Sequence, residues 1–297
     1  MTRLLKSAFL AIGLFFMSAS VFAATQTPVF VSPKWAYDHR KQVKFVDLSQ
    51  QYQKYHLPGA IMVNYGWLIR PQGKRRMEMS GGAKYMVKAL SELGISPKDD
   101  VVIYDDIGEL ESSRLYWELK KLGHKKVSLL DGGSVAWILD GYPVTQKMVK
   151  PVKTNYPLPK KNYEATYTAT KKDVLAAIKN PKIHLLDARS EQEYLGSKKV
   201  ARSGHIPSAI FFPWQASVNP ENKFKQRSTA QLKNIFTKLG LTNKNDEIIV
   251  YCHTGHRAAR LFTLFESQGY KNVKLYDGSM QEWEADITLP VKQGKQA

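Results

Sequence analysis

The stretch RLYWELKKLGHKKVSLLDGG, residues 114–133, occurs a second time in altered form as RLFTLFESQGYKNVKLYDGS, residues 260–279. Arg, Leu, Gly, Lys, Val, Leu, Asp and Gly recur in the same order at one constant offset, since 260 − 114 and 277 − 131 both equal 146. A repeat of this kind is typical of a chain built from two copies of one structural unit. The sequence therefore predicts two similar domains.

Shorter motifs precede this stretch in the same order in both copies. They are an apolar run ending in Asp, a His-x-Pro-x-Ala turn and a β-branched run: KFVD (44–47) and HLLD (184–187), HLPGAI (56–61) and HIPSAI (205–210), VVIY (101–104) and IIVY (248–251). Short buried strands that alternate with helices are typical of a parallel sheet with helices on both faces. We therefore expect an α/β fold in each copy.

The second copy shows this alternation most clearly. A turn containing Gly255 leads to an expected helix from about residue 256 to 268, and Gly269 is a natural stop for it. The apolar positions of this helix fall at spacings of three and four: Leu261, Leu264 and Phe265. NVKLYD, residues 272–277, is expected to form the next strand.

The organisation of the chain follows from the repeat and from composition. We predict an N-terminal domain at 27–145 and a C-terminal domain at 164–292. The segment between them, 146–163, continues a stretch rich in proline and lysine and is predicted to be a semi-rigid linker on the surface.

The first residues have the pattern of a secretory signal peptide. Two basic residues precede an apolar run over 8–17, and small residues occupy the −3 and −1 positions before Ala24. We predict that residues 1–23 are removed and that the protein is periplasmic; an uncleaved anchor is the alternative. No later run approaches about 18 apolar residues, so no stable membrane insertion is expected after cleavage.

The chain is basic, with 44 Lys and Arg against 26 Asp and Glu and a net charge of +18. The basic residues are spread along the sequence, and no nucleic-acid motif accompanies them. We expect no nucleic-acid partner. A positive field of this kind instead raises the local concentration of small anions.

Cys252 is the only cysteine of the 297 residues. In an exported protein, a cysteine without a partner can be a buried apolar residue, an intermolecular bridge or a reactive thiol. Here it follows a strand directly, and the amides of residues 253–257 can curl around its sulfur where a helix begins. Such a position favours the thiolate, which is a competent nucleophile.

The neighbours of the cysteine support this interpretation. His253, His256 and Arg257 are expected to add positive charge to a polar turn, CHTGHR, which does not resemble an apolar core segment. Cys252 and His256 have a spacing that could serve a metal, but no further ligands accompany them, so no metal site is predicted. Arg260 has a counterpart, Arg114, in the copy without cysteine, and is therefore interpreted as structural.

Taken together, these motifs resemble the rhodanese family of sulfurtransferases in its tandem two-domain arrangement. The resemblance covers nearly all of the chain beyond the signal peptide. It rests on a Cys-x-x-Gly-x-Arg loop between strand and helix, and on LLDAR (185–189), SGHIPSAI (203–210) and the YDGS…EW motif near the C-terminus. It implies two rhodanese-like domains, each with a five-stranded parallel sheet flanked by helices, and a catalytic cysteine in the second domain only.

The first copy lacks the reactive residues. Alignment of the strands places Asp105 opposite Cys252 and Ser49 opposite Arg189. The resemblance therefore implies a supporting, non-catalytic first domain.

The resemblance also implies a mechanism. Cys252 attacks the outer sulfur of an anionic donor such as thiosulfate, sulfite leaves, and the persulfide passes its sulfur to cyanide or another thiophilic acceptor. The expected substrate-binding residues are those of the loop and one arginine from the neighbouring strand: Arg189, His253, Thr254, Gly255, His256 and Arg257. A monomer without cofactor is expected.

The loop leaves alternatives open. His253 suits a thiosulfate enzyme, while the hydroxyl of Thr254 is nearer to the serine of mercaptopyruvate enzymes; later charge at positions 256 and 257 favours thiosulfate. A non-enzymatic persulfide carrier would use the same loop. A cysteine phosphatase is disfavoured, because its loop places five residues between cysteine and arginine and this one places four. Met280, where the family usually has tryptophan, is expected to affect packing.

Overall fold

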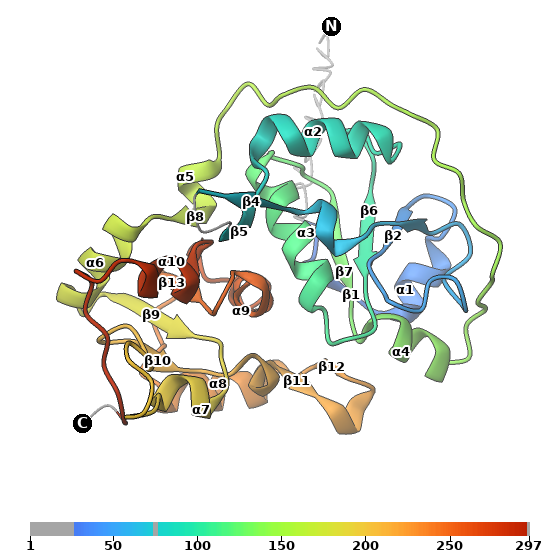
Figure 1. Ribbon diagram of the computed structural model, residues 1–297. Coiled ribbons are helices and arrows are strands. Elements are labelled where there is room, and N and C mark those ends of the chain that lie inside the picture. Colours follow the sequence, from blue (N-terminus) through green and yellow to red (C-terminus); the bar gives the residue numbers. More distant parts are fainter. Residues whose placement is uncertain (1–26, 74–76, 296–297) are drawn as a thin grey trace, which may run out of the picture.

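The computed structural model describes residues 27–73 and 77–295, and it contains two α/β domains (Figure 1). Each domain has a five-stranded sheet in which all neighbouring strands pair in parallel, in the orders β1-β7-β6-β2-β3 and β10-β9-β13-β14-β8. The predicted fold class is confirmed. The predicted signal peptide, residues 1–23, lies outside the described residues.

The described part of the first domain contains the following elements in chain order: β1 (Phe30–Val31), α1 (Pro33–Asp38), β2 (Lys44–Asp47), β3 (Ile61–Met62), η1 (Tyr65–Trp67), β4 (Ile69–Gln72), β5 (Met77–Ser80), α2 (Gly82–Glu92), β6 (Val101–Tyr104), α3 (Leu110–Lys121), β7 (Val127–Leu130) and α4 (Gly133–Leu139).

The second domain follows with these elements: α5 (Glu164–Tyr167), β8 (Thr168–Ala169), α6 (Lys171–Lys179), β9 (Ile183–Asp187), α7 (Glu191–Leu195), β10 (Ile210–Phe211), η2 (Trp214–Ser217), β11 (Val218–Asn219), η3 (Pro220–Asn222), β12 (Lys225–Gln226), α8 (Thr229–Lys238), β13 (Glu247–Tyr251), α9 (His256–Ser267), β14 (Asn272–Tyr276) and α10 (Ser279–Ala285).

Successive strand residues serve two different cores, because side chains alternate between the faces of a sheet. In β9, Leu185 belongs to the core covered by α6 and α10, while Leu186 belongs to the core covered by α8 and α9. Ile249 and Val250 of β13 divide in the same way. The core that receives Leu186 and Val250 continues into the first domain, so the two sheets share one apolar interior.

The helices α3 and α9 join the domains and lie side by side in the middle of the molecule (Figure 1). Ser113 and Thr263 face each other across the pair with their hydroxyl oxygens 3.1 Å apart. A further polar contact joins the pair, since the Tyr116 hydroxyl donates to Glu266 at 3.0 Å. The repeated sequence stretches at 114 and 260 thus begin within the domain interface.

A hairpin formed by β4 and β5 reaches from the first domain to the second (Figure 1). The Ser80 amide donates to the carboxylate of Asp277 at 2.8 Å, and the Glu78 amide donates to the side chain of Gln281 at 3.0 Å. Asp277 follows β14 directly, and Gln281 lies in α10. The hairpin therefore contacts the second domain next to α10.

Residues 146–163 contain no helix or strand and run over the outside of the first domain (Figure 1). They are held there by backbone and side-chain bonds: the Thr154 amide donates to the Ser91 carbonyl at 2.9 Å, and the Tyr156 amide donates to the Ser91 hydroxyl at 2.9 Å. Tyr156 is buried. Proline-rich composition and these contacts together keep the segment extended against the domain.

The His-x-Pro turns are packing features in both domains. His56 and His205 are fully buried, and their Nδ1 atoms lie 2.7 and 2.8 Å from the carbonyl oxygens of Tyr52 and Tyr194. Each imidazole also stacks on the same tyrosine with ring centroids 3.9 Å apart. In the described residues, no helix is both long enough and apolar enough to cross a membrane.

Candidate active site

Cys252 lies immediately after β13 and is 1% exposed. It belongs to the shared core on the side of α9, and α9 begins four residues later at His256. Gly255 caps this helix with a φ of +76°, a backbone conformation that residues other than glycine rarely adopt. The sulfur is therefore placed at the carboxyl edge of the sheet and at the N-terminus of a twelve-residue helix.

The turn after β14 is hydrogen-bonded to the cysteine loop. The hydroxyl oxygen of Ser279 accepts hydrogen bonds from the Cys252 amide at 3.1 Å and the Gly255 amide at 3.0 Å. The amides of Met280 and Gln281 donate in turn to the carbonyls of the loop, at 3.1 and 2.9 Å. Met280 is fully buried in the core of the second domain, so its role is in packing.

The first domain shows what this type of loop binds. Asp105, the counterpart of Cys252, points its carboxylate into its own loop, where one oxygen accepts the amides of Ile107 at 2.9 Å and Glu109 at 3.0 Å. The other oxygen accepts the amide and the hydroxyl of Ser112, both at 2.9 Å. In the first domain, the loop after β6 thus forms an anion cradle that is filled by a side chain of the chain itself.

Arg257 lies in the first turn of α9 and forms a two-pronged ion pair with Glu193 of α7, at 2.6 and 2.8 Å. Burial acts to lower the pKa of Arg257, but Glu193 and the nearby Cys252 outweigh it and raise this pKa. Burial opposes ionisation of Glu193 as well, and the arginine and the Ser190 amide nevertheless lower the pKa of Glu193 to about 2. The pair is therefore ionised at neutral pH.

Arg189 is buried and engaged by the strand that precedes it. Its guanidinium donates to both carboxylate oxygens of Asp187, most closely at 2.7 Å, and to the Gly204 carbonyl at 2.6 Å. In the first domain, Ser49 replaces this arginine, and burial raises the pKa of the corresponding Asp47 to about 6. Arg189 is close enough to Arg257 to act on its ionisation, so both predicted arginines lie near the loop, each held by a carboxylate.

His256 is half-buried, and its ring packs against the first domain. Its ring centroid lies 4.5 Å from that of Tyr65, and among the described residues its Nε2 atom has no hydrogen-bond partner. Burial, together with the positive charges of Arg114 and Arg257, lowers the pKa of His256 to about 4. The expectation that His256 adds positive charge is therefore wrong at neutral pH, because its environment favours the neutral imidazole.

The remaining residues of the loop are more open. His253 is exposed and Thr254 is half-buried. Glu284 of α10 lies within electrostatic range of His253 and Arg189, and burial raises the pKa of this glutamate. The mouth of the site thus combines groups of both signs.

Several residues around the loop were not among the predicted site residues: Tyr65, Arg114, Glu193, Asp277 and Ser279. Tyr65 and Arg114 come from the first domain and lie beside the loop of the second, so only the docking of the domains brings them there. Glu193 had a sequence signal as the last residue of the capping box Ser190-x-x-Glu193, but that motif does not disclose its pairing with Arg257.

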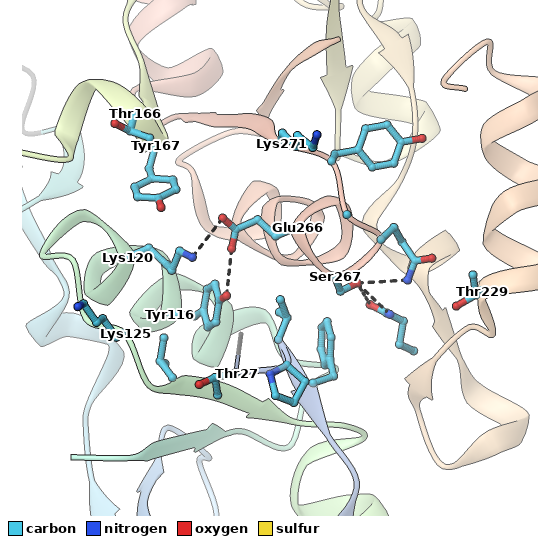
Figure 2. A pocket seen from close by; sticks show the side chains of 18 residues that line it. Thr27, Tyr116, Lys120, Lys125, Thr166, Tyr167, Thr229, Glu266, Ser267 and Lys271 are labelled. Atoms are coloured by element: carbon cyan, nitrogen blue, oxygen red, sulfur yellow. Dashed lines mark hydrogen bonds and ion pairs between the residues drawn. The ribbon is translucent and has the colours of Figure 1, made fainter. Parts of the chain in front are cut away.

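No group of three or more metal-ligating side chains is found in residues 27–73 and 77–295. A large cavity does occur, of about 780 Å³, but it lies between the other ends of α3 and α9 (Figure 2). In it, Glu266 accepts the Tyr116 hydroxyl and lies 3.5 Å from the Lys120 ammonium. Glu266 is ten residues beyond His256 on α9, about 15 Å along a helix, so this cavity is separate from the cysteine loop.

The fold and this site define the class of the protein. The rhodanese-like domain matches the chain twice, over residues 32–140 and 170–286. The chain belongs to the rhodanese family, as its motifs indicated.

The proteins similar to this chain are named for more than one activity. The chain is 36% identical over 282 residues to the "Putative thiosulfate sulfurtransferase 1" of Mycobacterium bovis, covering 90% of this chain and 98% of that one. It is 31% identical over 286 residues to the sulfur carrier protein TtuD of Thermus thermophilus, covering 90% and 98%. The 3-mercaptopyruvate sulfotransferase SseA of Escherichia coli superposes with a TM-score of 0.74 at 26% identity, covering 85% and 99%.

The depressed pKa of His256 predicts an acid-sensitive contribution to stability. Between pH 6.5 and about 4 the unfolded chain binds a proton at this histidine that the folded chain does not, so the free energy of unfolding falls as pH falls through this window. The loss is on the order of 2–3 kcal/mol. His256→Gln should be free of it, so that urea unfolding at pH 7 and pH 4 shows a smaller loss than in the wild type. Equal losses in both proteins would contradict the assignment, and His256→Asn should behave as His256→Gln does.

Proposed function

We propose that this protein is a sulfurtransferase that moves a sulfane sulfur from thiosulfate, through a persulfide on Cys252, to cyanide or another thiophilic acceptor. The observation that carries the proposal is the carboxylate of Asp105, bound by the amides of the counterpart loop. A loop of that design in the second domain has a cysteine where the first has a carboxylate. It suits a sulfur that is anionic at each stage, as thiolate and as persulfide.

The bond changes need no proton transfer. The Cys252 thiolate attacks the outer sulfur of thiosulfate; a new S–S bond forms on Cys252, the S–S bond of thiosulfate breaks, and its electron pair leaves with sulfite. Cyanide then attacks the outer sulfur of the persulfide, giving thiocyanate and regenerating the thiolate. The neutral state of His256 fits this sequence, because sulfite is a stable anion and does not require a general acid.

The arginines supply the positive charge for the donor. Arg257 lies within electrostatic range of Cys252, and Arg189 lies within range of Arg257. The oxyanion end of thiosulfate is the group that they would bind, with His253 at the exposed side. Glu193 competes for Arg257, so the affinity for a dianion depends on how the arginine is shared between the two.

Two other functions follow from the named relatives. The hypothesis that 3-mercaptopyruvate is the donor is supported by the structural similarity to SseA and by the hydroxyl of Thr254. The hypothesis of a sulfur carrier is supported by the sequence similarity to TtuD. Thiosulfate is favoured by the curated relatives named for it and by the net charge of +18, which attracts a dianion more strongly than a monoanion. We propose that the protein works as a monomer without cofactor.

The test is a comparison of donors. The chain from Ala24, and the same chain with Cys252→Ser, are assayed for thiocyanate formed from thiosulfate and cyanide, and for sulfur transfer from 3-mercaptopyruvate. We expect turnover with thiosulfate that the substitution abolishes. Turnover with mercaptopyruvate alone would assign the other donor, and persulfide on Cys252 by mass spectrometry without turnover would assign the carrier. With neither turnover nor persulfide, the proposal fails.

The ion pair of Arg257 predicts opposite effects for its two partners. Arg257→Gln should raise the KM for thiosulfate about tenfold or more, because a charge-assisted contact to the donor is lost. Glu193→Gln should lower this KM several-fold, since it removes a competing negative charge from the same arginine. Initial rates against thiosulfate concentration measure both. A rise in KM for both variants would mean that Glu193 serves to orient Arg257.

The N-terminal pattern supports export to the periplasm. Expression of all 297 residues in a Gram-negative host should yield a periplasmic protein whose N-terminal residue is Ala24. Intact-mass measurement on the periplasmic and membrane fractions tests this. Full-length protein in the membrane fraction would instead support the uncleaved anchor.

A further inference from the structure

A buried ion pair crosses the domain interface next to the cysteine loop. Arg114 of α3 is fully buried, and its Nη2 atom lies 2.6 Å from Oδ1 of Asp277, which follows β14 in the other domain. The opposite charges are in direct contact; burial acts to lower the pKa of Arg114, but Asp277, Tyr65 and Glu118 together raise it. The attraction is therefore mainly one of charge, in a region from which water is excluded.

The pair touches the loop at Gly255. A Cβ atom at this glycine would lie 2.6 Å from Nη1 of Arg114 and 2.9 Å from Oδ1 of Asp277, so the loop backbone rests on both charged groups. Gly255 also donates its amide to Ser279, two residues after Asp277. The ion pair, the turn after β14 and the loop of Cys252 thus form one packed unit.

The other end of the repeat provides an internal comparison. Arg260, the counterpart of Arg114, is equally buried and reaches into the loop of the first domain, where its Nε atom lies 3.3 Å from Glu109 and 3.2 Å from the Gly108 carbonyl. Each domain therefore places one arginine in contact with the corresponding loop of the other domain. Only Arg114 does so next to a cysteine.

We propose that Arg114, from the non-catalytic domain, is a positioning residue for the reactive cysteine: it neutralises Asp277 beneath the loop and so preserves a potential that favours the thiolate and persulfide anions of Cys252. The proposal rests on the proposed function, which it deepens. Without Arg114, an uncompensated carboxylate would lie against the backbone at Gly255, and a negative charge in a dry interior acts strongly on its neighbours.

The loop is faced by other charged or titratable groups from both domains. They are Tyr65, Glu111, Arg114, Glu118 and Lys121 of the first domain, and Arg189, Glu193, His253, His256, Arg257, Asp277 and Glu284 of the second. Glu118 is a second buried carboxylate beside Arg114, at 3.9 Å, and it is also paired with Lys121 at 3.1 Å. Arg114 and Cys252 both act electrostatically on the pKa of the Tyr65 hydroxyl, so the arginine and the sulfur lie near the same ring. Asp277 is the carboxylate in contact with the loop backbone. A substitution of Asp277 or Arg114 would therefore change the net charge next to the loop.

The experiment uses the single cysteine. Alkylation by iodoacetamide, followed by intact mass, can modify no cysteine other than Cys252, and the pH dependence of its rate reports the thiolate. We expect the midpoint of this profile to rise by about one pH unit or more in Arg114→Gln and to fall in Asp277→Asn. In the double variant, Arg114→Gln with Asp277→Asn, the midpoint should return close to that of the wild type.

The opposite signs separate charge from packing. A purely structural role would move both single variants in the same direction, and that result, or an unchanged midpoint in Arg114→Gln, would overturn the proposal. Arg114→Lys should keep the midpoint close to that of the wild type, because it retains the charge. If Arg114→Gln does not fold, as judged by circular dichroism, Asp277→Asn and Arg114→Lys still decide: an upward shift in either overturns the proposal.

Arg260→Gln is the matched control, since it removes an equally buried arginine from the same interface. It should lower the thermal midpoint as Arg114→Gln does but leave the alkylation profile unchanged; an equal shift in both would overturn the proposal. Alkylation requires no sulfur donor. Failure of sulfur transfer with the predicted shifts intact would therefore refute the proposed function alone, and transfer without the shifts would refute the role of Arg114 alone.

Discussion

The packing of α3 against α9 is the contact on which the rest of the structure depends. Each helix begins after the loop that follows the central strand of its own domain, so bringing the helices side by side also brings each loop against the other domain. The arginines near the start of the two helices become fully buried in this arrangement. A buried arginine requires a nearby carboxylate, and Asp277 and Glu109 meet this requirement from the opposite domain.

The two loops differ in what occupies them, and this difference divides the labour between the domains. In the first, the carboxylate of Asp105 satisfies the amides of the loop permanently. In the second, the same place at the strand end has Cys252, a residue whose charge depends on its chemical state. The first domain therefore contributes Tyr65 and Arg114 to the surroundings of the loop, while the second contributes the cysteine for which we propose reactivity.

Much of this could be predicted from sequence because it is local. The repeat identified two domains, the β-branched runs marked β6 and β13, and helix α9 was expected from about 256 to 268 and spans His256–Ser267. The position of Cys252 between strand and helix followed from the same pattern. The contacts of Tyr65, Arg114 and Glu193 could not be predicted, because they depend on how separate elements pack. The neutral state of His256 is of the same kind, since a histidine in a polar turn gives no sign that another domain will bury it.

The filled loop of the first domain also has an evolutionary consequence. Placing a cysteine at position 105 would remove the carboxylate and leave its amides without an anion, yet the loop would still be one residue longer and position 49 would still lack an arginine. Several coordinated changes would be required before such a cysteine had a suitable environment, and loss of the carboxylate alone would leave buried amides unsatisfied. The two copies are therefore hard to make alike by single substitutions, and the stability of the filled first loop preserves the asymmetry of the two domains.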